Sequence, residues 1–174
     1  MQDFEGISLM VRKKFESNLG SFSVTYEPDL TPNTTFHQDS ISIIKNQYTL
    51  KGMHMQYGAY AQSKLVTVLQ GSITDFFIGL RKGSKTYLDY GSVDINESNA
   101  NIIFIPSGFA HGYITLESNT IISYKLGASY SPEHELTLMW NDARINIDWP
   151  VKKNLYMSEK DLSGLSFNDI EKKL

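Results

Sequence analysis

The middle of the chain is a series of short runs rich in β-branched and aromatic residues, separated by glycine, proline, serine or asparagine. The clearest runs cover residues 64–73 (KLVTVLQGSI), 74–80 (TDFFIGL), 101–105 (NIIFI) and 120–126 (TIISYKL). Such runs are typical of β-strands, and no helical periodicity lies between them. The pattern predicts an all-β fold, a sandwich or barrel of roughly six to ten strands.

Helix signals are confined to the C-terminal end. Residues 168–174 (NDIEKKL) predict a short helix capped by Ser166 or Asn168, with acidic residues early and lysines late. A helical turn is also expected over residues 158–162, where Ser158 is the cap and Asp161 follows three residues later. We therefore expect short C-terminal helices appended to the β-structure.

Composition restricts the class of protein. The chain has 174 residues, no repeat and no long linker, so we expect one domain over residues 1–174. The absence of cysteine excludes disulfides, thiolate nucleophiles and sulfur-ligated zinc. A net charge of −3 provides no general attraction for nucleic acid or an anionic membrane. The sequence has no apolar run near the ~20 residues needed to span a bilayer and no signal-peptide pattern, so a soluble cytoplasmic protein is expected.

Two of the four histidines lie in or beside predicted strands. His54 and His111 could face one interior, although each could equally be a partly buried histidine that donates to a backbone carbonyl. A metal site is not expected, because Gln56 stands where a second histidine ligand would follow His54. The nearest carboxylates in the sequence, Asp39 and Glu117, are also far from either histidine.

Acid–base chemistry without a metal fits these residues better. It needs a base with a pKa near the working pH, a carboxylate that orients the base, a cation for developing negative charge, and often a second acid. His54, Lys64, His111 and Tyr124 are candidates for the base, cation and acid, although spacing alone does not show that they converge. Lys51 and Lys64 could also be solvated side chains.

Several longer motifs point to a known family. In order along the chain they are LKGMHMQ, AQSKLVTVLQGSITDFFIGLRKGSKTY, IPSGFAHGYITL, SYKLGASYSPEHELTLMWNDARINIDWP and SEKD. Their order and spacing resemble those of the nucleotide-sugar 3,5-epimerase family, of the dTDP-4-dehydrorhamnose 3,5-epimerase type, over residues 36–161. The resemblance implies a cupin-type jelly roll, a homodimer, no cofactor, and a nucleotide-diphosphate sugar as substrate.

The resemblance also implies roles for individual residues. His54 matches the family's catalytic base, and Asp161 matches the aspartate that pairs with it. Lys64 would stabilise the enolate oxygen, Tyr124 would be the general acid, and His111 would lie in the sugar pocket.

Further positions match the family's substrate-binding residues. Tyr130 and Lys51 would hold the nucleotide base and the diphosphate, and Gln38 and Gln56 are also expected to bind substrate. The implied activity is epimerisation at C3, C5 or both of a nucleotide-diphosphate 4-keto-6-deoxy sugar, by metal-independent proton transfer through an enolate.

Three positions depart from the family pattern, all at the diphosphate end of the expected site. Leu19 replaces an arginine that binds diphosphate, often in the neighbouring subunit's site. Lys51 replaces another arginine, which keeps the charge but loses bidentate geometry. Ser40 replaces an asparagine. These departures leave the nucleotide open among dTDP, GDP, CDP and UDP.

Alternatives remain at this stage. A mono-epimerase or ketoisomerase acting on a related 4-keto nucleotide sugar, including a GDP-4-keto-heptose, would use the same pocket. A non-catalytic cupin that binds a sugar nucleotide would explain the weakened diphosphate positions. A metal-dependent cupin enzyme is disfavoured by the spacing of the histidines.

Overall fold

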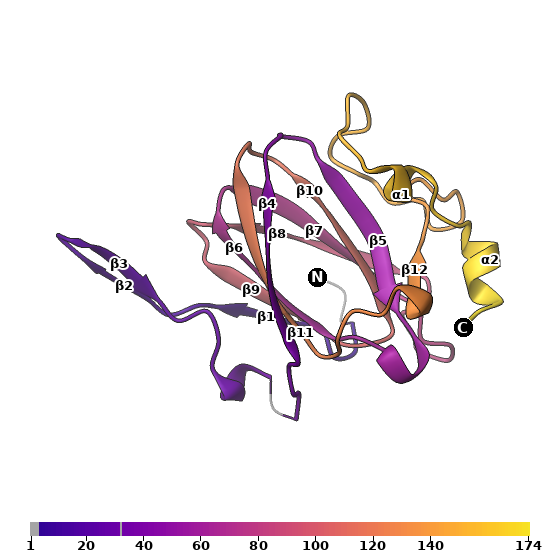
Figure 1. Cartoon of the computed structure of the whole chain (residues 1–174), viewed down its shortest axis with the longest axis horizontal. Helices are drawn as coiled ribbons and strands as arrows, with labels where there is room; N and C mark the ends of the chain where they lie inside the picture. The colour runs from indigo at the N-terminus through magenta and orange to yellow at the C-terminus, as the bar shows by residue number, and fades with distance from the viewer. Residues whose placement is uncertain (1–3, 32) are drawn as a thin grey trace.

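Two antiparallel β-sheets face each other in the computed structural model of the chain, which describes residues 4–31 and 33–174 (Figure 1). Residues 1–3 and 32, part of the domain expected over 1–174, lie outside the described residues. The first sheet contains, in spatial order, β1 (Ser8–Val11), β9 (Asn101–Ile105), β6 (Lys64–Gln70), β11 (Thr120–Leu126) and β4 (Gln38–Ile44). The second contains β12 (Glu135–Thr137), β5 (Leu50–Gln56), β10 (Phe109–Thr115), β7 (Ser72–Gly79) and β8 (Tyr90–Asn96). The predicted all-β class is confirmed.

Smaller elements surround the two sheets. The hairpin of β2 (Lys14–Ser17) and β3 (Gly20–Ser23) projects away from the sandwich (Figure 1). Short 3-10 turns are formed by Pro28–Leu30, Gly58–Tyr60 and Pro132–His134. The helices α1 (Glu159–Leu162) and α2 (Phe167–Glu171) lie near the C-terminus. No helix within 4–31 and 33–174 is long and apolar enough to cross a membrane.

The predicted C-terminal helices are confirmed, with caps of the expected kind. The Ser158 side chain accepts a hydrogen bond from the Asp161 amide, and that of Ser166 accepts one from the Asp169 amide. Of the two caps considered for the last helix, Ser166 is the observed one. Helix α2 is shorter than the predicted 168–174, because the chain after Glu171 leaves the helix as a turn.

The predicted strands over 101–105 and 120–126 are confirmed, but the run over 64–73 is not one strand. It breaks at Gly71, where φ is +81° and the chain leaves the first sheet for the second. A Cβ atom on Gly71 would lie 2.5 Å from the Thr120 hydroxyl oxygen. The break therefore needs glycine both for its backbone angle and for its close approach to β11.

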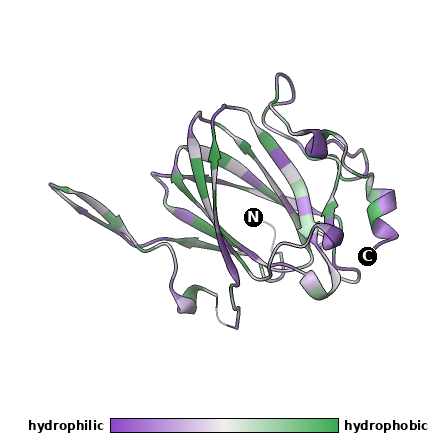
Figure 2. Cartoon of the chain, in the orientation of Figure 1, coloured by the Kyte–Doolittle hydropathy of each residue, from purple (hydrophilic) through white to green (hydrophobic). Residues whose placement is uncertain are grey.

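The central strands of the second sheet, β7 and β10, are buried on both faces, although polar residues lie among their apolar ones (Figure 2). In β7, Ile73 and Phe77 join the cluster between the sheets, whereas Phe76 and Ile78 pack on the outside under the C-terminal segment. Trp149 belongs to that outer cluster, with its ring centroid 4.4 Å from that of Phe76. The C-terminal segment thus covers the outer face of this sheet and carries α1 to the end of β5.

Candidate active site

A pocket of about 230 Å³ opens between the two sheets. Its lining combines histidines, lysines, tyrosines and small polar residues from both sheets: Ser40, Ser42, Lys51, His54, Gln62, Lys64, His111, Gly112, Tyr113, Tyr124, Leu126 and Glu135. The expectation that His54 and His111 share a pocket is met. Lys51, Lys64 and Tyr124 also lie in its wall.

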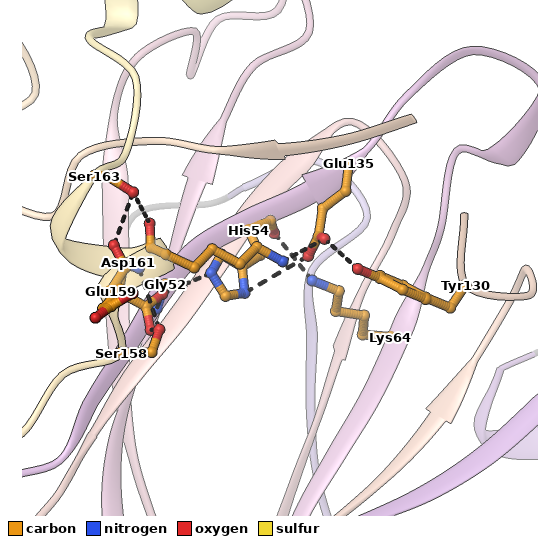
Figure 3. A network of polar contacts seen from close by, with 10 residues as sticks. Gly52, His54, Lys64, Tyr130, Glu135, Ser158, Glu159, Asp161 and Ser163 are labelled. Atoms are coloured by element: carbon orange, nitrogen blue, oxygen red, sulfur yellow. Dashed lines mark hydrogen bonds and ion pairs between the residues drawn. The ribbon is translucent and has the colours of Figure 1, made fainter. Parts of the chain in front are cut away.

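His54, in β5, is paired with Asp161, in α1. The Nε2 atom of His54 lies 2.7 Å from Oδ1 of Asp161 (Figure 3). Asp161 also accepts hydrogen bonds from the Ser158 hydroxyl at 2.5 Å and the Gly52 amide at 3.0 Å. Burial would raise the pKa of Asp161, but these hydrogen bonds and the nearby His54 lower it below its usual value. An ionised Asp161 accepts the Nε2 proton and leaves the Nδ1 lone pair free to act as a base.

Gly52 makes this pairing possible. Its φ is +123°, and a Cβ atom there would lie 2.5 Å from the Cα of Gly112 in β10. The close approach lets β5 point its amide at Asp161 while His54 turns into the pocket. The register between β5 and β10 shifts at this point, between His111 and Tyr113.

A second histidine–aspartate pair lies deeper in the sandwich. Nε2 of His111, in β10, lies 2.7 Å from Oδ2 of Asp75, in β7. The Asp75 side chain has no exposed surface, and its other oxygen has no hydrogen-bond partner in the described part of the chain. Burial raises the pKa of Asp75 and lowers that of His111, with each residue partly opposing the shift of the other.

Lys64, in β6, interacts with a residue of each pair, His54 and Asp75. Its ammonium donates a hydrogen bond to the backbone oxygen of His54 at 3.0 Å. Burial lowers its pKa to about 8, although the negative charges of Asp75 and Glu135 oppose that shift. A buried lysine of this kind is a cation that can stabilise negative charge on a bound molecule.

Glu135, at the start of β12, faces the other side of His54. Its Oε1 atom lies 3.9 Å from Nδ1 of His54, and its Oε2 atom accepts hydrogen bonds from Lys160 and, at 2.8 Å, from the Tyr130 hydroxyl (Figure 3). Burial would raise the pKa of Glu135, but its hydrogen bonds with Lys160 and Tyr130 lower it. Glu135 therefore places a negative charge beside the free nitrogen of His54.

Tyr124, in β11, enters the pocket from the first sheet, opposite His54 and His111 of the second. Its ring centroid lies 6.4 Å from that of His111 in an edge-to-face arrangement. Burial raises the pKa of Tyr124 well above its usual value, so the phenol keeps its proton at neutral pH.

The remaining expected substrate-binding residues lie at the rim or behind it. Gln38 accepts a hydrogen bond from the Tyr130 amide at 3.2 Å and donates one to Ser40 at 3.0 Å. Gln56 is buried and does not line the pocket, and its amide forms hydrogen bonds with the backbone of Tyr60, Ser129 and Ser131. Its role in substrate binding stays a prediction. Lys51 lines the pocket, with its ammonium 3.5 Å from the Ser42 hydroxyl.

Two carboxylates of the site were missed by the sequence-based reasoning. Asp75 interrupts the apolar run TDFFIGL, and an acidic residue within a buried strand is a signal that it has a partner. Glu135 lies in the SPEHEL segment, where nothing in the local pattern separates it from Glu133. The carboxylates that meet the histidines are therefore Asp161, Asp75 and Glu135, all remote from them in the sequence.

No group of three or more histidine, cysteine or acidic side chains suited to a metal ion occurs among residues 4–31 and 33–174. Metal independence stays a prediction.

Comparison with known proteins identifies the family. The family model described as dTDP-4-dehydrorhamnose 3,5-epimerase matches residues 2–169. The dTDP-4-dehydrorhamnose 3,5-epimerase of Sinorhizobium fredii is 40% identical over 133 residues, which cover 76% of this chain and 68% of that protein.

Solved structures agree in fold over nearly the whole chain. A Bacillus anthracis dTDP-4-dehydrorhamnose 3,5-epimerase with TDP and PPi bound has a TM-score of 0.90 and 32% identity, covering 95% of this chain and 97% of that one. A Legionella pneumophila 3,5-epimerase in complex with dTDP-4-keto-L-rhamnose has a TM-score of 0.92 and 28% identity, covering 99% and 93%. The expected cupin-like jelly roll is confirmed. The chain belongs to the dTDP-4-dehydrorhamnose 3,5-epimerase family of isomerases.

Proposed function

We propose that the protein epimerises a dTDP-4-keto-6-deoxy sugar at C3 and C5 by acid–base proton transfer, without a metal or redox cofactor. The observation that carries the proposal is the placement of the base and the acid. His54, oriented by Asp161, comes from the second sheet, and Tyr124 comes from the first. A sugar ring between the sheets would therefore meet a base on one face and a proton donor on the other.

The chemistry follows from the keto group of the substrate. A carbonyl at C4 acidifies the hydrogens at C3 and C5, because loss of either gives a conjugated enolate. Neutral His54 removes the proton through Nδ1, while Lys64 and His111 stabilise the charge that develops on the C4 oxygen. Each well-placed donor of this kind typically lowers the barrier by about 3 kcal/mol. Tyr124 then delivers a proton to the opposite face, which inverts the carbon.

Substitution of the base and the acid tests the mechanism. His54→Ala should abolish deuterium incorporation from D₂O at both C3 and C5, as followed by NMR. Tyr124→Phe should keep incorporation but lose inverted product. Tyr156→Phe, which changes an exposed tyrosine outside the pocket, is the matched control and should behave as wild type. Retained incorporation at either carbon in His54→Ala would show that a different base acts there.

The nucleotide is tested by binding. Relatives of this chain are named for dTDP sugars, and one solved structure holds TDP. Thermal unfolding with dTDP, GDP, CDP and UDP should show the largest stabilisation with dTDP, about 2.7 kcal/mol at 100 times its Kd. A larger stabilisation with GDP than with dTDP would indicate that the substrate is a different nucleotide sugar.

We also propose that the protein is a homodimer. Ile41 and Ile43 of the edge strand β4 are 64% and 68% exposed, which leaves apolar surface beside an open sheet edge. The hairpin of β2 and β3 projects from the sandwich (Figure 1), and Leu19, in its turn, is 93% exposed. Sedimentation equilibrium should give twice the chain mass, and the Ile41→Lys/Ile43→Lys double variant should be monomeric. The cytoplasmic location stays a prediction.

A further inference from the structure

Tyr113 is a second phenol in the pocket wall, and the proposed mechanism does not use it. It lies in β10 two residues after His111 and is 3% exposed. Its hydroxyl oxygen is buried and has no hydrogen-bond partner of acceptable geometry among the described residues. Buried polar groups are nearly always paired, so a buried phenol without a well-formed hydrogen bond at the wall of a reaction pocket indicates that its hydrogen bond is completed only during the reaction.

Tyr124 is an ionisable neighbour of Tyr113 from the opposite sheet. The His111 ring contacts both phenol rings, with centroid distances of 6.3 Å to Tyr113 and 6.4 Å to Tyr124. Burial raises the pKa of Tyr113, and hydrogen-bonding interactions of its hydroxyl with the side chains of Tyr124 and Ser42 oppose that rise. The two phenols are therefore close enough that a charge on one changes the energy of the other.

We propose that Tyr113 is a positioning residue behind Tyr124. When Tyr124 protonates the substrate, the Tyr113 hydroxyl donates a hydrogen bond to the Tyr124 phenolate and so stabilises its negative charge. The inference rests on the proposed function. The O–H bond of Tyr124 breaks, a C–H bond forms on the sugar, and the electron pair stays on the Tyr124 oxygen. That oxygen then accepts a hydrogen bond from Tyr113.

In the resting protein the Tyr113 hydroxyl lies near the Tyr124 and Ser42 side chains but makes no well-formed hydrogen bond among the described residues. A hydrogen bond that strengthens only as charge develops on Tyr124 stabilises the transition state and not the bound substrate. Loss of this hydrogen bond should therefore lower kcat and leave KM unchanged. Because the hydroxyl oxygen of Tyr113 is itself buried, it acts through Tyr124 and does not touch the sugar.

The test is Tyr113→Phe, which keeps the buried ring and removes only the hydroxyl. The kcat for inverted product should fall about five- to tenfold, the size of one net hydrogen bond. KM and the rate of deuterium incorporation by His54 should stay at wild-type values, so the ratio of exchange to inversion should rise by the same factor. The unfolding temperature should not fall, because the hydroxyl removed makes no well-formed hydrogen bond among the described residues.

Tyr90→Phe is the matched control. The Tyr90 hydroxyl accepts a hydrogen bond from the Asp148 amide at 3.1 Å and lies outside the pocket. This variant should lose stability and keep its kcat.

Three results would overturn the inference: an unchanged kcat in Tyr113→Phe, a raised KM with kcat unchanged, or a loss of stability like that of Tyr90→Phe. Absence of any inverted product from wild-type protein would instead refute the proposed function itself.

Discussion

The two histidine–aspartate pairs have the same chemistry and opposite surroundings. Each joins a histidine Nε2 to a carboxylate oxygen at 2.7 Å. The His54 side chain is 25% exposed, whereas that of His111 is 6% exposed. Asp161 accepts two further hydrogen bonds from Ser158 and Gly52, whereas Asp75 has an oxygen without any partner in the described part of the chain.

The difference shows how environment assigns roles to identical side chains. Hydrogen bonds lower the pKa of Asp161 against the effect of its burial, so this carboxylate stays ionised and holds one tautomer of an accessible imidazole. Burial raises the pKa of Asp75 and lowers that of His111, so the inner pair favours neutral forms. The outer pair, His54 and Asp161, is suited to accept a proton from a substrate. The inner pair, His111 and Asp75, is suited to donate a hydrogen bond in a low-dielectric part of the pocket wall.

The largest expected effect comes from replacing the aspartate of one pair at a time with asparagine. Asp161→Asn should slow deuterium incorporation at C3 and C5 about 10³- to 10⁴-fold, because the amide favours the wrong tautomer of His54. Asp75→Asn should slow it about a hundredfold, the usual loss when one hydrogen-bond donor to a developing oxyanion, here His111, is disturbed. NMR in D₂O measures both variants on one substrate. Equal losses would mean that the two pairs do not have separate roles.

Lys64 interacts with His54 of one pair and Asp75 of the other. Its titration should produce the next largest effect, a pH dependence of kcat/KM. Its pKa is about 8, chiefly because it is buried, and its cationic form is the one that stabilises an enolate. That form is present below pH 8 and is lost as the pH rises, so kcat/KM should fall about tenfold per pH unit above 8. Lys64→Arg stays charged, so the residual activity of this variant should lack the alkaline fall. A fall at the same pH in that variant would assign it to another group.

The sequence predicted the outer pair better than the inner one. The family motifs contain both His54 and Asp161, and the Ser158 cap that fixes α1 was visible as a local pattern. Asp75 was missed because its partner comes from a different strand, and only the pairing of β7 with β10 places it beside His111. Strand positions followed from composition, whereas the change of sheet at Gly71 did not, because it depends on the contact with Thr120.

The smallest expected effect is on the free energy of unfolding. Replacing Asp161 and replacing Asp75 should change it in opposite directions. Asp161 has a folded pKa below 3.8, so its stabilisation is present above that pH and is lost in acid. Asp161→Asn should therefore lower the free energy of unfolding by about 2 kcal/mol at pH 7. Asp75 has a folded pKa above 3.8, so its buried charge costs stability as the pH rises. Asp75→Asn keeps an acceptor for His111 without that charge and should be more stable than wild type at pH 7. Urea unfolding of both variants at a series of acid pH values up to pH 7 should show two differences from wild type that shrink in acid and diverge in opposite directions as the pH rises. Differences of the same sign at pH 7 would mean that burial does not separate the two aspartates.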